Sequence, residues 1–168
     1  MDAIVFMSNT GYTEKYAHLL ADATGIPAFS MAEAEKGVKA DAEIIYMGWL
    51  MAGSVKGCKK ALAKYSVRAV CAVGMAPPSQ QVEDETRRKY NLTDTPVFVL
   101  QGGFNMKKLH GIYKLMMKMM ANTVGKKLAA KDNKTPNEIE MMDLMLNGGD
   151  RVSAENLTPV TDWFKSIS

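Results

Sequence analysis

Five short apolar runs are separated by amphipathic segments along the first 104 residues. The runs cover residues 3–7, 27–30, 43–48, 68–74 and 96–101. Unbroken apolar runs of this length are typical of strands buried on both faces of a parallel sheet. The segments between them predict helices over 13–24, 57–65 and about 79–90, and a short helix or loop over 31–40. This alternation predicts an α/β fold built from βαβ units around a parallel sheet.

Residues 105–148 break this alternation. Leu109, Ile112, Leu115, Met116 and Met119 follow a helical spacing and predict a helix over 107–122, with lysines on its polar side. A polar stretch over 125–134 follows, and Thr135-Pro136 predicts the start of another helix that ends near Asn147. The last helix is expected from about Thr158. We expect one domain over 1–168, with a helical insertion at about 105–148.

Composition narrows the class of protein. The chain has 168 residues, of which 47% are hydrophobic and 23% charged, as in ordinary globular domains. Its net charge of +3 is too small to indicate nucleic-acid binding, and no run approaches the roughly 20 apolar residues of a membrane span. Cys58 and Cys71 form no metal-binding pattern. With no signal peptide, we expect a reducing, cytoplasmic setting. From the cysteine spacing and the small net charge, we expect no metal and no nucleic-acid partner.

The candidate chemistry lies where the first apolar run ends. There a turn containing three hydroxyls and one glycine precedes a helix: Ser8, Asn9, Thr10, Gly11, Tyr12 and Thr13. Backbone N–H groups at a helix start favour an anion, and hydroxyls add donors. The turn contains no lysine, so it is not a nucleoside triphosphate loop, and it suits a single phosphate. The alternative is a capped helix start, for which one hydroxyl would suffice.

The turn, with the apolar strand before it and Ala17 after it, resembles the phosphate loop of flavodoxins. Residues 48–57, a Gly-x-x-x-x-Gly turn before a lysine-bearing helix, are similar to the second loop of that family. The resemblance covers about 1–104 and the last helix. Residues 97–120 and the Asp162-Trp163 pair resemble the flavodoxin-like menaquinone-dependent protoporphyrinogen oxidases.

This resemblance implies a five-stranded sheet of order 2-1-3-4-5 and bound FMN. It implies that the turn from Ser8 to Thr13 holds the phosphate. The flavin ring would then lie against a second and a third loop, formed respectively by Trp49, Leu50, Met51, Ala52 and Gly53, and by Gly74, Met75, Ala76 and Pro77. We expect the Ala52-Gly53 peptide to face the reactive edge of the ring, because glycine tolerates backbone rotation.

The implied function is that of an FMN-binding redox protein. It would either transfer electrons to a redox partner or oxidise a small substrate. The most specific form of the second function is a porphyrinogen- or quinone-dependent oxidation. The alternative is a flavodoxin-fold binding or regulatory module without flavin. The third loop lacks the usual aromatic residue, which disfavours a pure electron carrier. The isoelectric point of about 8.8 disfavours basic redox partners and suits an acidic partner or an anionic substrate. No catalytic side chain is assigned, because a cofactor would carry the chemistry.

The methionine-rich helix over 107–122 allows two interpretations. Methionine fills irregular gaps in cores, so the helix could be ordinary core packing. A basic, amphipathic helix also suits peripheral contact with a membrane, a quinone or an acidic partner. The pattern leaves this choice open, and it does not fix the oligomeric state.

Overall fold

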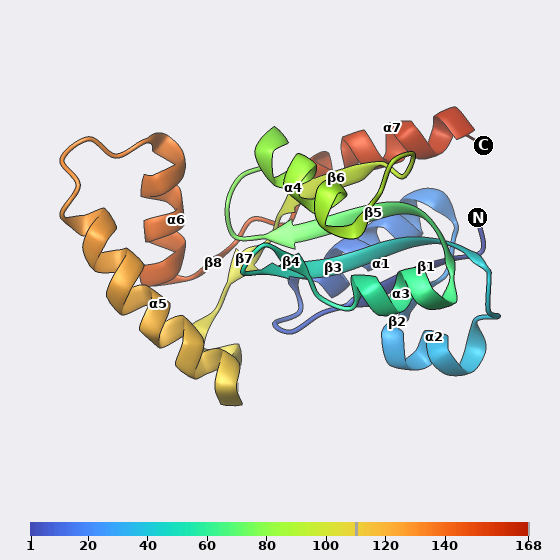
Figure 1. Ribbon diagram of the computed structural model, residues 1–168, viewed down its shortest axis with the longest axis horizontal. Coiled ribbons are helices and arrows are strands. Elements are labelled where there is room, and N and C mark those ends of the chain that lie inside the picture. The colour runs from blue at the N-terminus through green and yellow to red at the C-terminus, as the bar shows by residue number, and fades with distance from the viewer. Residues whose placement is uncertain (110, 168) are drawn as a thin grey trace.

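The computed structural model describes residues 1–109 and 111–167, and within them a parallel sheet forms the centre of the protein (Figure 1). Its strands lie in the order β2-β1-β3-β5-β6, and every neighbouring pair is parallel. They are β1 (Ala3–Met7), β2 (Ala28–Ser30), β3 (Glu43–Met51), β5 (Ser66–Gly74) and β6 (Val97–Gln101). The predicted α/β class, with a mostly parallel sheet of about five strands, is confirmed.

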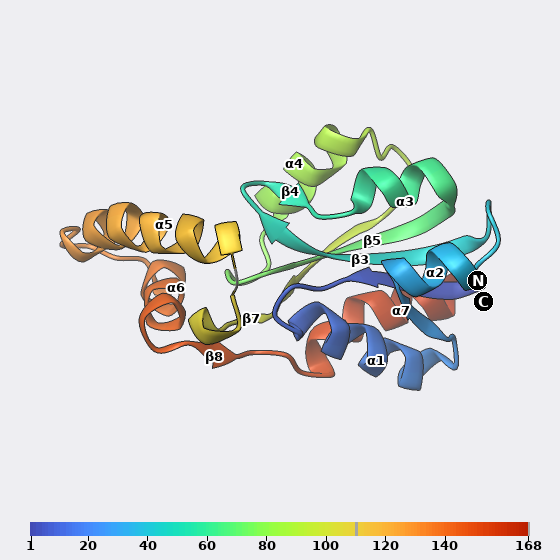
Figure 2. The same cartoon turned by 90° about the horizontal axis from the view of Figure 1, so that it is seen from below.

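Helices cover both faces of this sheet (Figure 2). The helices α1 (Tyr12–Thr24) and α7 (Thr158–Ile167) pack on one face, and α2 (Met31–Gly37), α3 (Cys58–Lys64) and α4 (Gln80–Tyr90) pack on the other. Successive strand residues point to opposite faces, so Ile4 joins the core under α1 while Val5 joins the core under α3. Burial on both faces explains why the strands are apolar without interruption.

The sequence predicts a loop after the third predicted strand, but the structure has a β-hairpin there. Strand β3 continues to Met51 and then turns back into β4 (Ser54–Val55), with Met51 paired to Ser54. Ala52 and Gly53 form the two-residue turn, with φ angles of 48° and 66°. Two left-handed residues are what a tight type I′ hairpin requires, and the hairpin pairs backbone groups that a loop would leave unpaired.

The insertion is a pair of helices that stands beside the α/β layers, at the carboxyl ends of the strands (Figures 1 and 2). The predicted helix over 107–122 is misplaced at both ends: a 3₁₀ turn, η1 (Met106–Lys108), comes first, and α5 (Gly111–Ala129) then runs into the predicted polar stretch. His110 lies outside the described residues. None of the described helices has the length and apolar character needed to cross a membrane.

The second helix of the insertion, α6 (Pro136–Asn147), begins and ends where the sequence predicts. The Thr135 hydroxyl accepts the Glu138 N–H at 3.3 Å, and Glu138 accepts the Thr135 N–H at 2.8 Å, which completes a capping box. Two short antiparallel strands, β7 (Gly103–Phe104) and β8 (Gly149–Asp150), pair where the insertion leaves and rejoins the α/β layers. A 3₁₀ turn, η2 (Glu155–Leu157), leads into α7.

Candidate functional site

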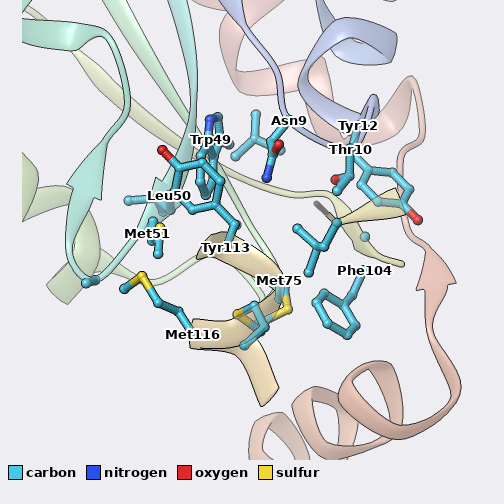
Figure 3. A pocket seen from close by; sticks show the side chains of 16 residues that line it. Asn9, Thr10, Tyr12, Trp49, Leu50, Met51, Met75, Phe104, Tyr113 and Met116 are labelled. Carbon is cyan, nitrogen blue, oxygen red and sulfur yellow. The ribbon is translucent and has the colours of Figure 1, made fainter. Parts of the chain in front are cut away.

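A cavity of about 350 Å³ opens at the carboxyl ends of β1, β3 and β5, and part of α5 closes one side of it (Figure 3). Its volume lies within the roughly 300–1,000 Å³ that is usual for small-molecule sites. Its lining is formed by Asn9, Thr10, Tyr12, Trp49, Leu50, Met51, Ala52, Val73, Gly74, Met75, Gly103, Phe104, Leu109, Tyr113, Met116 and Met117. Among these described residues none is charged, so a charged ligand group must be held by neutral donors.

The turn between β1 and α1 lies at one end of the cavity, where Asn9, Thr10 and Tyr12 line it. Gly11 takes a left-handed φ of 93°, and its N–H donates to the Ser8 hydroxyl oxygen at 3.1 Å. In the described part of the chain, no side chain caps α1. The first N–H groups of a helix have no acceptor within that helix, so those of Tyr12, Thr13 and Glu14 remain available. Ser8 therefore shapes the turn, and the start of α1 supplies the donors.

The side chain of Asn9 provides a further donor at this end. Its amide nitrogen is buried and makes no hydrogen bond within residues 1–109 and 111–167. Figure 3 shows this side chain between Trp49 and Thr10, on the wall of the cavity. A buried amide without a partner is unfavourable by about 1–3 kcal/mol. An acceptor atom of a ligand bound in the cavity would satisfy it.

Two aromatic side chains from distant parts of the chain meet over the cavity. Trp49 of β3 and Tyr113 of α5 pack edge to face, with ring centroids 5.2 Å apart and planes at 84°. The Lys56 ammonium lies 5.8 Å from the Trp49 ring centroid. Together with Leu50, Met116 and other apolar lining residues, this pair gives the cavity an apolar wall that suits a flat, apolar ring.

The turn of the β3–β4 hairpin is held from outside the cavity. The Lys89 ammonium, in the last turn of α4, donates to the Gly53 carbonyl at 2.9 Å and to the Ser54 hydroxyl at 2.6 Å. Ala52 lines the cavity, whereas Gly53 does not. The Gly53 carbonyl is thus directed toward α4 rather than toward the cavity.

The loop after β5 is tied to the insertion. The Gln101 amide donates to the Met75 carbonyl at 3.2 Å and to the Glu140 carboxylate of α6 at 2.9 Å. Arg151 in turn donates to Glu140 at 3.3 Å and lies 3.5 Å from Asp143. This network fixes α6, and with it the helical pair, at the edge of the cavity.

Tyr12, at the base of the cavity wall, remains a neutral phenol at physiological pH. Burial and the nearby Asp150 carboxylate both raise its pKa above the ordinary value of 10.0, and the effect of Lys15 in the opposite direction is smaller. Asp150 itself forms an ion pair with Lys15. The charge of this aspartate is therefore neutralised by Lys15, outside the cavity lining.

Nine of the fifteen residues predicted from the sequence line the cavity. Those that do not line it are Ser8, Gly11, Thr13, Gly53, Ala76 and Pro77. Seven further lining residues are not predicted from the sequence, namely Val73, Gly103, Phe104, Leu109, Tyr113, Met116 and Met117. Most of these belong to the insertion, where the spacing of apolar residues predicts a helix but does not say which turn faces the sheet.

The core-packing interpretation of the methionine-rich helix holds for part of the described residues of α5, and another part is exposed, as the second interpretation requires. Leu109 is buried just before the helix, and Tyr113 and Met117 pack against a small cluster formed by Phe104, Leu109 and Leu144. In contrast, Ile112, Leu115, Met116 and Met119 of α5 are exposed to solvent. Comparisons of the chain with models of protein families, with curated proteins and with solved structures find no match.

Proposed function

We propose that this chain is an FMN-binding redox protein with a flavodoxin-like fold. The strand order β2-β1-β3-β5-β6 supports this, because it leaves the carboxyl ends of β1 and β3 side by side where the order reverses. The single observation that carries the proposal is the pairing of two unlike ends in one cavity. Among the described residues, one end carries the Asn9 amide without a partner and lies beside the first N–H groups of α1, and the other end is an apolar, aromatic wall.

The residues present fit a phosphate at the turn from Ser8 to Thr13. The N–H groups that open α1, the Thr10 hydroxyl and the Asn9 amide are neutral donors, and the helix dipole adds partial positive charge. Because the described lining residues include no cation, the site suits the single phosphate of a mononucleotide better than a triphosphate. The buried Asn9 amide, which has no partner among the described residues, supports the proposal that a ligand acceptor completes the turn.

The apolar wall would hold the ring system. Trp49 and Tyr113 offer flat surfaces, and Met75, Met116 and Met117 offer polarisable sulfur contacts that adapt to an aromatic edge. When bound, FMN supplies reversible one- and two-electron redox chemistry. The chain's own part is to grip the phosphate, orient the ring and exclude water with α5, and Lys89 holds the hairpin turn in one conformation.

Oxidation of a small substrate is favoured over electron transfer between proteins. Here α5 covers one side of the cavity with Tyr113, Met116 and Met117. A covered, apolar site suits a substrate that enters it. A quinone has a flat, apolar ring, and a porphyrinogen is the alternative substrate. We place this activity in the cytoplasm, where the two unpaired, buried cysteines stay reduced.

Flavin content tests the proposal directly. Protein purified in the dark should be yellow with one FMN per chain, or the colourless apoprotein should bind added FMN and quench its fluorescence. Riboflavin, which lacks the phosphate, should bind at least tenfold more weakly, since each hydrogen bond to a charged group contributes about 1.5–3 kcal/mol. Protein that neither contains nor takes up FMN would refute the proposal and favour a binding module without flavin.

A second measurement separates the two redox roles. Photoreduction of the loaded protein should proceed in a single two-electron step if it oxidises a small substrate, and in two one-electron steps if it shuttles electrons. Reoxidation by a soluble quinone analogue, followed by flavin absorbance, should then be faster than reoxidation by a one-electron protein acceptor. The reverse order would assign the chain to electron transfer.

A further inference from the structure

An apolar stripe runs along the outer side of α5. It consists of Ile112, Leu115, Met116 and Met119, which follow the i, i+3, i+4, i+7 spacing of one helix face. Their side chains are 66%, 59%, 43% and 63% exposed. Single exposed apolar residues are common, but four contiguous ones on one helix are a sign of an interaction surface. The cavity does not account for this stripe, because of the four residues only Met116 lines it.

Positive charge is concentrated in the segment that contains this stripe. Residues 105–131 contain seven of the 21 Lys and Arg residues and none of the 18 acidic ones. The rest of the chain, with 14 basic and 18 acidic residues, carries a net charge of −4. The modest overall value of +3 therefore conceals a strongly basic helix on an otherwise acidic protein.

The lysines of α5 are free to meet an external partner. Lys114, Lys118 and Lys126 are exposed, and none of them takes part in an ion pair in the part of the chain that the structure describes. Figures 1 and 2 show α5 and α6 projecting beyond the carboxyl ends of the strands, at the opposite end of the molecule from α2. The stripe and its lysines therefore lie on an outlying part of the protein that a flat surface can reach.

We propose that α5 docks on the surface of a membrane that contains anionic lipids. Such a surface accepts both features of the helix at once: the apolar side chains enter the boundary between headgroups and acyl chains, and the lysines reach anionic headgroups. A second copy of the chain is a poorer occupant, because it would bring two acid-free, lysine-rich helices together. Docking does not depend on what fills the cavity, so the tests of docking and of FMN binding are independent of each other.

Docking would also place the cavity at the lipid boundary. Met116 belongs to both the stripe and the cavity lining, and Tyr113 and Met117 of the same helix face the cavity. A lipid-soluble substrate could then pass from the membrane to the cavity along α5 without crossing water.

Vesicle co-sedimentation of the full chain tests the proposal. The protein should sediment with vesicles of phosphatidylcholine containing about one third phosphatidylglycerol and should stay in solution with pure phosphatidylcholine. At about 1 M salt the Debye length falls to about 3 Å, and binding should weaken at least tenfold. The variant Lys114→Glu/Lys118→Glu should weaken binding at least 20-fold, since each lysine near such a surface is worth about fivefold.

The apolar contribution is tested with Ile112→Ser/Met119→Ser, which should weaken binding at least tenfold while circular dichroism shows the same helix content. Two controls match these variants at the other end of the molecule. Lys36→Glu/Lys59→Glu makes the same charge change on exposed sites of α2 and α3, and Ile167→Ser removes an exposed apolar side chain of α7. Both controls should bind the anionic vesicles as the parent protein does.

Three results would overturn the proposal. One is the absence of binding to anionic vesicles at low salt. Another is binding that the α5 variants and the controls change equally. The third is a dimer seen by sedimentation equilibrium that Ile112→Ser/Met119→Ser dissociates, because the stripe would then be an interface between copies of this chain.

Discussion

Replacing Asn9 by leucine should affect stability and ligand binding in opposite directions. Leucine has a similar size but no donor, so the variant removes a buried amide that lacks a partner in the described structure. An unsatisfied buried polar group is unfavourable by about 1–3 kcal/mol. The apoprotein of Asn9→Leu should therefore be as stable as the parent or gain up to that amount.

The same change should weaken FMN binding. A hydrogen bond to a charged acceptor contributes about 1.5–3 kcal/mol, which corresponds to a rise in Kd of about 10- to 150-fold. Urea denaturation of the apoprotein and quenching of FMN fluorescence on titration measure the two effects on one preparation. A loss of stability with unchanged FMN affinity would refute the reasoning, because Asn9 would then serve the fold and not a ligand.

Tyr65→Phe provides the matched control. The Tyr65 hydroxyl is the other buried side-chain atom without a partner among the described residues, and it lies in the core beneath α2 and α3, outside the cavity lining. Its removal should stabilise the apoprotein for the same reason as Asn9→Leu and should leave the Kd for FMN unchanged. Equal effects of both variants on FMN binding would show that global stability, and not the Asn9 amide, controls affinity.

Three further predictions concern the stability of the fold. Ala52→Gly should raise the free energy of unfolding in urea by about 0.5–1 kcal/mol, because Ala52 has a φ of 48° and glycine removes the left-handed strain. Gly103→Ala should lower the free energy of unfolding by about 1–3 kcal/mol, because the added carbon would lie 2.4 Å from the Gly149 carbonyl oxygen. The control Gly37→Ala adds a carbon in open space and should be neutral or stabilising. Burial raises the pKa of the Cys71 thiol from 9.0 to about 12, so stability should fall as pH rises above about 9, where only the unfolded thiol ionises. Cys71→Ala should reduce the slope of this decline in the free energy of unfolding by about 1.4 kcal/mol per pH unit. Urea denaturation at several pH values measures the slope, and an unchanged slope would contradict this assignment.

Local patterns determined most of the α/β layers. Unbroken apolar runs predict strands such as β1 and β6, because both faces of these strands are buried. The Thr135-Pro136 pair predicts the start of α6, because capping depends only on adjacent residues. The turn from Ser8 to Thr13 was also visible, since hydroxyls and a glycine between an apolar run and a helix are a short-range pattern.

Pairing between distant segments decided the rest. The extension of β3 to Met51 depends on hydrogen bonds with β4. Gln101 reaches the Met75 carbonyl because β6 pairs with β5, and it reaches Glu140 because α6 folds back beside it. The periodicity of α5 showed that an apolar face exists, but not that Tyr113 and Met117 face the cavity while Ile112 and Met119 face solvent. A sequence records the spacing of side chains along one helix, whereas the direction that each face takes is set by the segments it packs against, and those lie far away in the chain.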